Sequence, residues 1–281
     1  MSPRVSVVVP AYNNGDYVEQ TLRSVLDQTY TDFELVVADH ASQDDTWDRI
    51  QPFADDPRVR LERTEAGGGA RRNWNRVSEL ARGELIKLVC GDDLLRPTML
   101  AEQIEALDAA GDNAVMVASQ RDLVDARGDV FLRSRGLDAL DGVVSGPAAL
   151  RATVRSGTNI FGEPACVLLR TDALRAAGWW QDLRYYIDAG SYAPVMVTGD
   201  VVALRRPLAA FRVSASQWSV RLMKAQAEEA AEFHRLAQRL APTEISDSDV
   251  RRGDRMAKLV ALQRRAAYTA LGKRMRPLPR D

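Results

Sequence analysis

Two adjacent carboxylates, Asp92 and Asp93, stand directly after an apolar run that begins at Leu85. The run is short and bounded by Gly83 and Gly91, which is typical of a buried strand. At the C-terminal end of such a strand, side chains face the crevice where open α/β sheets bind ligands. Mg²⁺ or Mn²⁺ needs only one or two protein carboxylates when substrate phosphates supply other ligands. The pair could equally cap a following helix, so on its own it leaves both a metal site and a helix cap open.

Three further polar clusters follow the ends of other predicted elements. They are Val-Pro-Ala-Tyr-Asn at residues 9–13, Asp-His-Ala-Ser-Gln-Asp-Asp-Thr at residues 39–46 and Gly-Ala-Arg-Arg-Asn-Trp-Asn at residues 69–75. The first two follow the first and second predicted strands, and the third opens a helix. Because ligands bind beyond the carboxyl ends of strands in such sheets, we expect these clusters to share one site with the two aspartates.

Short strands and helices alternate regularly as far as Asp93. Continuous apolar runs at residues 5–9 and 33–38 are typical of central parallel strands, and residues 18–26 repeat at helical spacing between them. This alternation predicts a parallel sheet with helices on both faces. Beyond Asp93 the alternation is less regular. We expect later strands at residues 115–118, 165–169, 201–204 and 208–213, the last two on either side of Pro207. Helices are expected at residues 99–109, 147–154 and 171–177, and from residue 217 the chain should be helical, ending in a helix at residues 247–271.

The composition is that of an ordinary globular protein. The 281 residues are 46% hydrophobic and 27% charged, and the net charge of −1 gives no overall field that would favour nucleic acid or a membrane. Two cysteines, Cys90 and Cys166, make no disulfide framework and suit a reducing cytoplasm. We expect no signal peptide, and no apolar run approaches the ~18 residues of a membrane-spanning helix.

Taken together, the four clusters resemble the family 2 glycosyltransferases, which are inverting enzymes of the GT-A fold. The resemblance covers residues 5 to about 107 and thins beyond them. It implies an α/β fold in which helices flank a mixed, mostly parallel sheet. Residues 1–110 would then form the nucleotide-sugar-binding half, residues 111–215 the acceptor-binding half of the same domain, and residues 216–281 a helical C-terminal extension.

The resemblance also implies roles for individual residues. Asp39 would accept the imide N–H of uracil or thymine, so the donor would be a UDP- or dTDP-sugar. Mn²⁺ or Mg²⁺ would be bound by Asp92 and Asp93 together with diphosphate oxygens. The nucleotide-binding set would be Pro10, Ala11, Tyr12, Asn13, Asp39, Arg71, Arg72, Asn75 and Asp92, and either Arg71 or Arg72 would reach the diphosphate. Ser42 and Asp44 fit better as turn and cap residues than as ligands.

Inverting transfer requires a carboxylate that removes the proton of the acceptor hydroxyl. Asp188 falls at the family's base position, although a helix cap is its alternative, and Glu163 is a second candidate or an acceptor ligand. Cys90 stands where many relatives carry the first acid of the metal motif, and Ser214 replaces a common His. Arg212 would contact the diphosphate or form a structural ion pair.

The C-terminal stretch at residues 251–280 is strongly basic. It could lie on an anionic membrane beside a lipid-linked acceptor, or it could be a solvated or oligomer-packing face, as in a homodimer. We therefore predict a cytoplasmic, metal-dependent enzyme, present in some settings at the inner face of the membrane, that does not bind nucleic acid. It would glycosylate a hydroxyl or amine in bacterial cell-surface glycan or natural-product synthesis. The alternatives are a catalytically silent sugar-nucleotide-binding protein and a nucleotidyltransferase, although residues 10–13 are not the Gly-rich basic loop that the latter needs.

Overall fold

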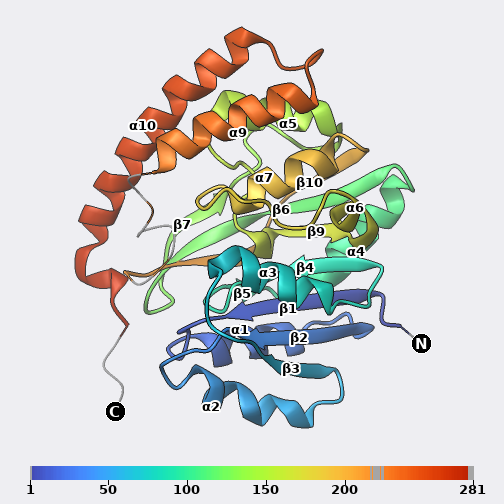
Figure 1. Ribbon diagram of the computed structural model, residues 1–281, viewed down its shortest axis with the longest axis vertical. Coiled ribbons are helices and arrows are strands. Elements are labelled where there is room, and N and C mark those ends of the chain that lie inside the picture. The colour runs from blue at the N-terminus through green and yellow to red at the C-terminus, as the bar shows by residue number, and fades with distance from the viewer. Residues whose placement is uncertain (1, 216, 218–221, 223–224, 278–281) are drawn as a thin grey trace.

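A computed structural model describes residues 2–215, 217, 222 and 225–277 (Figure 1). Within these residues one mixed sheet runs through the molecule, with the strand order β3-β2-β1-β4-β9-β6-β10-β5. The N-terminal strands are parallel and are β1 (Val5–Ala11), β2 (Phe33–Asp39), β3 (Val59–Arg63) and β4 (Leu85–Leu88). Strands β1 and β2 are buried along their whole length, as their continuous apolar, β-branched sequences predict.

The second half of the sheet is mixed. Strand β9 (Val167–Arg170) lies antiparallel between β4 and β6 (Ala114–Asp125), and β10 (Asp200–Val213) runs parallel to β6. The short strands β5 (Leu94–Leu95) and β8 (Gly142–Ser145) pair with β10, and β7 (Val130–Arg135) pairs with β6. This arrangement confirms the predicted mixed, mostly parallel sheet.

The prediction of two strands on either side of Pro207 was wrong. Strand β10 passes through Pro207 without a break, but its register against β6 shifts on both sides of that residue. Proline has no N–H to donate to the ladder, so the strand continues with an irregularity at this point. The sequence signal for a break was therefore a signal for a bulge.

Helices cover the sheet (Figure 1). They are α1 (Val18–Leu26), α2 (Thr46–Ile50), α3 (Gly69–Glu79), α4 (Met99–Ala110), α5 (Gly146–Ser156), α6 (Thr171–Ala176), α7 (Ile187–Met196), α9 (Gln226–Leu240) and α10 (Asp247–Leu271), with 3₁₀ turns at Gln51–Asp55, Pro164–Cys166 and Gly272–Met275. The long helix α10 packs on α9 and α5 at the end of the molecule opposite β3. Much of the helical chain expected from residue 217 up to α9 lies outside the described residues.

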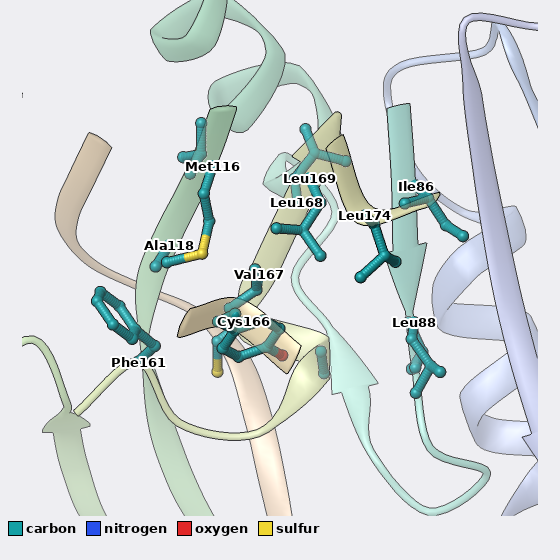
Figure 2. Packing of buried hydrophobic residues seen from close by; sticks show 14 of the residues in the cluster. Ile86, Leu88, Met116, Ala118, Phe161, Cys166, Val167, Leu168, Leu169 and Leu174 are labelled. Atoms are coloured by element: carbon teal, nitrogen blue, oxygen red, sulfur yellow. The ribbon is translucent and has the colours of Figure 1, made fainter. Parts of the chain in front are cut away.

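The core between the two halves is built by β4, β9 and β6. Figure 2 shows Leu168 of β9 between Ile86 of β4 on one side and Met116 of β6 on the other, all of them buried. Lys87 is fully buried in the same layer, and its Nζ donates to the carbonyls of Ala165, at 2.8 Å, and Val167, at 3.0 Å. These bonds fasten the turn after Glu163 to the strand that leads to Asp92 and Asp93.

None of the described helices is both long enough and apolar enough to cross a bilayer.

Candidate functional site

A cavity of about 640 Å³ opens beyond the carboxyl ends of β1, β2 and β4. This volume lies within the usual range for small-molecule sites. Residues lining it include Pro10, Tyr12, Asn13, His40, Cys90, Asp92, Asp93, Arg121, Asn159, Glu163, Tyr185, Asp188 and Arg264. The structure thus brings the end of β1, the two aspartates after β4 and both predicted catalytic carboxylates into one cavity.

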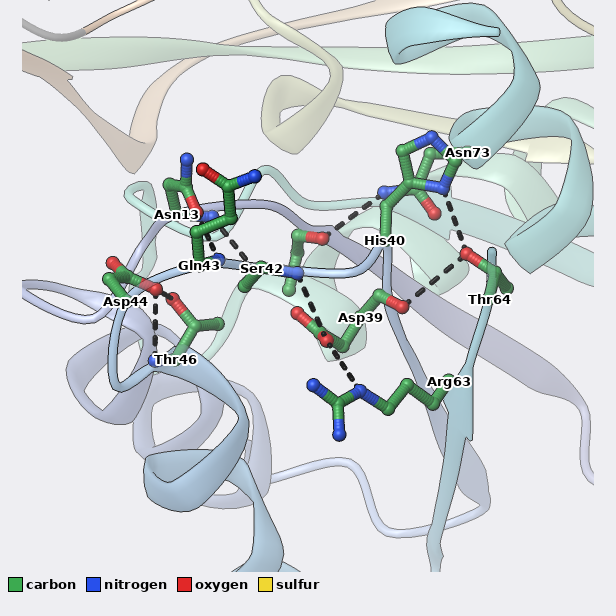
Figure 3. A network of polar contacts seen from close by, with 11 residues as sticks. Asn13, Asp39, His40, Ser42, Gln43, Asp44, Thr46, Arg63, Thr64 and Asn73 are labelled. Atoms are coloured by element: carbon green, nitrogen blue, oxygen red, sulfur yellow. Dashed lines mark hydrogen bonds and ion pairs between the residues drawn. The ribbon is translucent and has the colours of Figure 1, made fainter. Parts of the chain in front are cut away.

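One end of the cavity is shaped by the turns after β1 and β2, which are joined by hydrogen bonds (Figure 3). The backbone N–H of Asn13 donates to Ser42 Oγ at 3.0 Å, and that of Gln43 donates to Asn13 Oδ1 at 2.9 Å. Asn13 adopts a left-handed conformation, with φ of 51°, which Asn tolerates better than most residues. Asp44 accepts hydrogen bonds from the backbone and hydroxyl of Thr46. Ser42 and Asp44 therefore act as turn residues, and Tyr12 is left 48% exposed at the cavity wall.

Asp39 lies fully buried behind this wall (Figure 3). Its Oδ2 accepts the backbone N–H of Ser42 at 3.3 Å and lies 3.5 Å from Nε of Arg63. Its Oδ1 is buried and has no hydrogen-bond partner among the described residues. An unsatisfied buried carboxylate oxygen is costly, so this atom is well suited to accept an N–H from a ligand.

The imidazole of His40, next to Asp39, is held in place. One ring nitrogen lies 2.8 Å from Thr64 Oγ1 and the other 2.7 Å from the carbonyl oxygen of Gly67. The ring also packs edge-on to Tyr12, with centroids 6.2 Å apart. His40 therefore acts as a structural support of this part of the cavity wall.

Asp92 and Asp93 also line the cavity, and Arg212 holds the turn that carries them. The Arg212 guanidinium is buried; its Nε donates to the backbone carbonyl of Asp92 at 3.0 Å, and its backbone N–H donates to Asp93 Oδ1 at 3.2 Å. A further bond of 2.8 Å reaches Gln20. Arg212 thus braces this turn mainly through backbone groups, and its contact with a diphosphate stays a prediction.

The surroundings of Asp92 and Asp93 disfavour the ionised forms of both side chains. Burial raises the pKa of Asp92 to about 6, although the Arg212 charge acts against this. Burial, followed by the charges of Asp92 and Glu163, raises the pKa of Asp93 well above its usual range. A cation placed between these groups would favour their ionised forms.

The residues present fit a divalent cation only if the ligand completes its coordination. The described residues contain no group of three or more His, Cys, Asp or Glu side chains arranged to hold a metal. Asp93 Oδ2, however, is buried without a partner among these residues, and Asp92 lines the cavity beside it. Burial also raises the pKa of Cys90 well above its usual value, so Cys90 presents a neutral thiol and no ligand for Mg²⁺.

Asp188 and Glu163 differ in their surroundings. Asp188 stands in the first turn of α7, where its Oδ2 accepts from Asn159 Nδ2 at 2.8 Å, and burial raises its pKa to about 7. Glu163 is paired with Arg121, with 2.7 Å between Nε and Oε2. Gly162, with φ of +81°, permits this pairing because a Cβ there would lie 2.8 Å from the Arg121 guanidinium.

Arg71, Arg72 and Asn75 do not line this cavity. They border a neighbouring hollow together with Arg63 and Arg76, and His40 lines both this hollow and the cavity. Arg71 Nε donates to the Trp180 carbonyl at 3.1 Å, and Asn75 Oδ1 accepts the Trp180 N–H at 2.9 Å. The contact of these three residues with a nucleotide stays a prediction, and in this structure they hold other partners.

Sequence reasoning missed several cavity residues, among them Arg121 and Arg264. Arg121 lies in β6 and pairs with Glu163, 42 positions away. Arg264 belongs to α10 and was counted only as part of a basic stretch. Neither follows a strand end or belongs to a motif, so no sequence signal pointed to them.

The fold and the position of the cavity are those of an α/β protein with a ligand site at the carboxyl ends of its strands, and sequence comparison identifies its family. The model of glycosyl transferase family 2 matches residues 6–177, which is more than half of the 281 residues. The chain belongs to this family. A relative from Mycobacterium tuberculosis, itself uncharacterised, is 32% identical over 229 residues, which are 79% of this chain and 70% of the relative.

Other relatives match a shorter segment. The putative teichuronic acid biosynthesis glycosyltransferase TuaG of Bacillus subtilis is 36% identical over 104 residues, which are 37% of this chain and 41% of TuaG. The match thus spans less than half the length of that relative.

Solved structures share the fold. TarS of S. aureus (residues 1–349, in complex with UDP-GlcNAc) superposes with a TM-score of 0.68 at 17% identity, covering 97% of this chain and 75% of TarS. The mannosyltransferase PcManGT of Pyrobaculum calidifontis, in complex with GDP-Man and Mn²⁺, gives 0.66 at 18% identity and covers 97% and 76%. The GT-A fold implied by the motifs is therefore confirmed.

Proposed function

We propose that this family 2 glycosyltransferase transfers a sugar from a UDP- or dTDP-sugar to a hydroxyl or amine acceptor, with inversion at the anomeric carbon. One observation carries the proposal: the groups that a pyrimidine nucleotide diphosphate requires lie in or next to one cavity. Asp39 Oδ1 has no hydrogen-bond donor among the described residues and is adjacent in sequence to His40, which lines the cavity, while Asp92 and Asp93 line it directly. Uracil and thymine each offer an imide N–H to such an oxygen.

Asp92 and Asp93 would hold Mn²⁺ or Mg²⁺ in this function. A bound divalent cation supplies positive charge for the diphosphate leaving group. Arg212 keeps the carboxylate turn in place through the Asp92 carbonyl and the Asp93 side chain. The complex of PcManGT with GDP-Man and Mn²⁺ is consistent with divalent metal use on this fold.

Asp188 would act as the general base. Its Oδ1 accepts from the neighbouring Ala189 N–H and its Oδ2 from Asn159, so the carboxylate is held in one orientation in the cavity wall. With its pKa raised to about 7 by burial, it is a stronger base than an ordinary aspartate and is still largely ionised above neutral pH. Glu163 is less suited, because the Arg121 guanidinium already neutralises it.

The setting we propose is bacterial cell-surface glycan or natural-product synthesis. TuaG, a relative, is named for teichuronic acid biosynthesis. The free thiols of Cys90 and Cys166 suit the cytoplasm. Helix α10 exposes Leu259 and Leu262, by 53% and 65%, on a helix rich in arginine, which supports contact with an anionic membrane.

The test is thermal unfolding with a panel of UDP-, dTDP- and GDP-sugars, each with and without Mn²⁺. A ligand at a hundred times its Kd stabilises the native state by about 2.7 kcal/mol. We expect a UDP- or dTDP-sugar to raise Tm, and to do so only with Mn²⁺. Stabilisation by GDP-sugars alone, or by none of the panel, would refute the donor assignment.

A catalytically silent binding protein is the second candidate, favoured by Cys90 in the metal motif. It predicts the same thermal shift with no chemistry. Release of free nucleotide from the stabilising donor in the presence of Mn²⁺ separates the two, because a silent protein leaves the donor intact.

A further inference from the structure

The cavity contains a positive charge that the donor chemistry leaves unused. Arg264 projects from α10, a helix that lies beyond the region matched by the family model, and reaches the cavity wall. Its Nη2 donates to Thr158 Oγ1 at 2.9 Å, its Nη1 donates to the hydroxyl of Tyr185, and its guanidinium lies 5.7 Å from the Tyr185 ring centre. All its partners are neutral.

The other arginines of this wall have carboxylate partners. Arg121 pairs with Glu163 at 2.7 Å and Arg184 with Glu229 at 3.5 Å. In the described part of the chain, no carboxylate lies within 4.0 Å of the Arg264 guanidinium. Glu163 is close enough to act on Arg264 electrostatically, but its carboxylate is already paired with Arg121, so the Arg264 guanidinium has no anion in direct contact and can bind one.

The neighbours of Arg264 can also serve an anion. Thr158 and Tyr185 accept its N–H groups through their oxygens, so each hydroxyl keeps its own proton free to donate. The hydroxyls of Thr158 and Tyr185 and the guanidinium of Arg264 thus lie together at one point of the cavity wall. A phosphate, which offers several strong acceptor oxygens, matches this arrangement better than a single carbonyl or hydroxyl does.

The place of these residues assigns the anion to the acceptor. Thr158 and Tyr185 are both placed close to Asp188. Thr158 directly precedes Asn159, which binds the Asp188 carboxylate, and Tyr185 stands just before α7, whose first turn contains Asp188. Tyr12, Asp39, Asp92 and Asp93 define the donor side. An in-line displacement brings the acceptor in from the side of the base.

We propose that the acceptor carries a phosphate or diphosphate group that binds Arg264, Thr158 and Tyr185 while its hydroxyl faces Asp188. The inference rests on the proposed function, because it takes Asp188 as the base. It makes α10 a specificity element, since the anion-binding guanidinium comes from the C-terminal extension.

The test titrates phenyl phosphate calorimetrically into the full chain, first saturated with UDP and Mg²⁺ and then without either. Arg264→Gln is compared with Arg265→Gln, which removes the same charge from the next, exposed position of the same helix. We expect saturable binding to the wild type, weakened about ten- to a hundredfold by Arg264→Gln and unchanged by Arg265→Gln. Arg264→Lys keeps the charge without the fork and should weaken binding severalfold, which preserves the test if Arg264→Gln does not fold.

Equal phenyl phosphate affinity in the wild type and in Arg264→Gln or Arg264→Lys would overturn the proposal, as would no binding to the wild type. Failure of UDP to bind would instead refute the donor assignment. The titration without UDP still reads the Arg264 site in that case, so the two failures are distinguishable.

Discussion

Asp188→Asn tests the electrostatics of the proposed base through protein stability as well as through turnover. Burial raises the pKa of Asp188 to about 7, against 3.8 for the unperturbed group, so between these pH values the folded protein binds more protons than the unfolded chain. Stability therefore falls as pH rises through that window, and the full cost of holding the ionised carboxylate is present above pH 7. A shift of this size corresponds to at most about 4 kcal/mol, and contact with cavity water reduces it.

The substitution also removes a hydrogen bond. Asp188 accepts hydrogen bonds at both oxygens, from Ala189 and Asn159, and an amide can accept only at one of its two terminal atoms. The lost bond costs about 1 kcal/mol. We expect Asp188→Asn to be more stable than the wild type by about 1–2 kcal/mol at pH 8 and less stable by about 1 kcal/mol at pH 4, so that the difference changes sign.

Thermal unfolding from pH 4 to pH 8 measures this difference. Asp172→Asn is the matched control, because Asp172 also stands in the first turn of a helix and accepts the next backbone N–H, but it is exposed. Its effect should not depend on pH in this way. Donor binding should survive Asp188→Asn, while turnover falls by about 10²–10⁴-fold. An Asp188→Asn variant that is less stable than the wild type at pH 8, or that retains full turnover, would refute the reasoning.

Three further predictions concern the rest of the cavity. Asp93→Asn should abolish the Mn²⁺ dependence of donor binding while leaving the fold intact, and isothermal titration that still shows metal-dependent binding would remove Asp93 from the metal site. Asp39→Asn should weaken UDP by about tenfold or more, since an amide at this buried site matches the imide N–H less well than a carboxylate; unchanged UDP affinity would exclude contact with the base. Gly91→Ala should destabilise the protein by about 1–3 kcal/mol, because a Cβ would lie 2.7 Å from Asn14 Oδ1, which itself binds the Tyr12 N–H, and chemical denaturation showing no loss would contradict this packing.

The parallel half of the fold was predictable because its signals are local. Continuous apolar runs ending in polar residues gave β1, β2 and β4, and with them the position of Asp39, Asp92 and Asp93 at one edge of the sheet. These residues are adjacent in sequence to the strands that place them. The order of the clusters was therefore enough to predict that they meet.

The orientation of helix residues was not predictable in the same way. The start of α3 was found, but Arg71 and Asn75 turn toward the Trp180 backbone, which comes more than a hundred residues later. Arg264 reaches the cavity from α10 and binds Thr158, 106 positions away. Contacts at such separations depend on how the two halves pack, and one sequence carries no local signal of that packing.

The central claim, inverting transfer from a nucleotide sugar, is tested most directly by ¹H NMR of the sugar first released from an α-linked UDP- or dTDP-sugar in the presence of Mn²⁺. Spectra taken before mutarotation distinguish the two anomers. The account predicts that the β-anomer appears first, that its release requires Mn²⁺, and that Asp93→Asn abolishes it. First release of the α-anomer, or release that does not depend on metal, would contradict it.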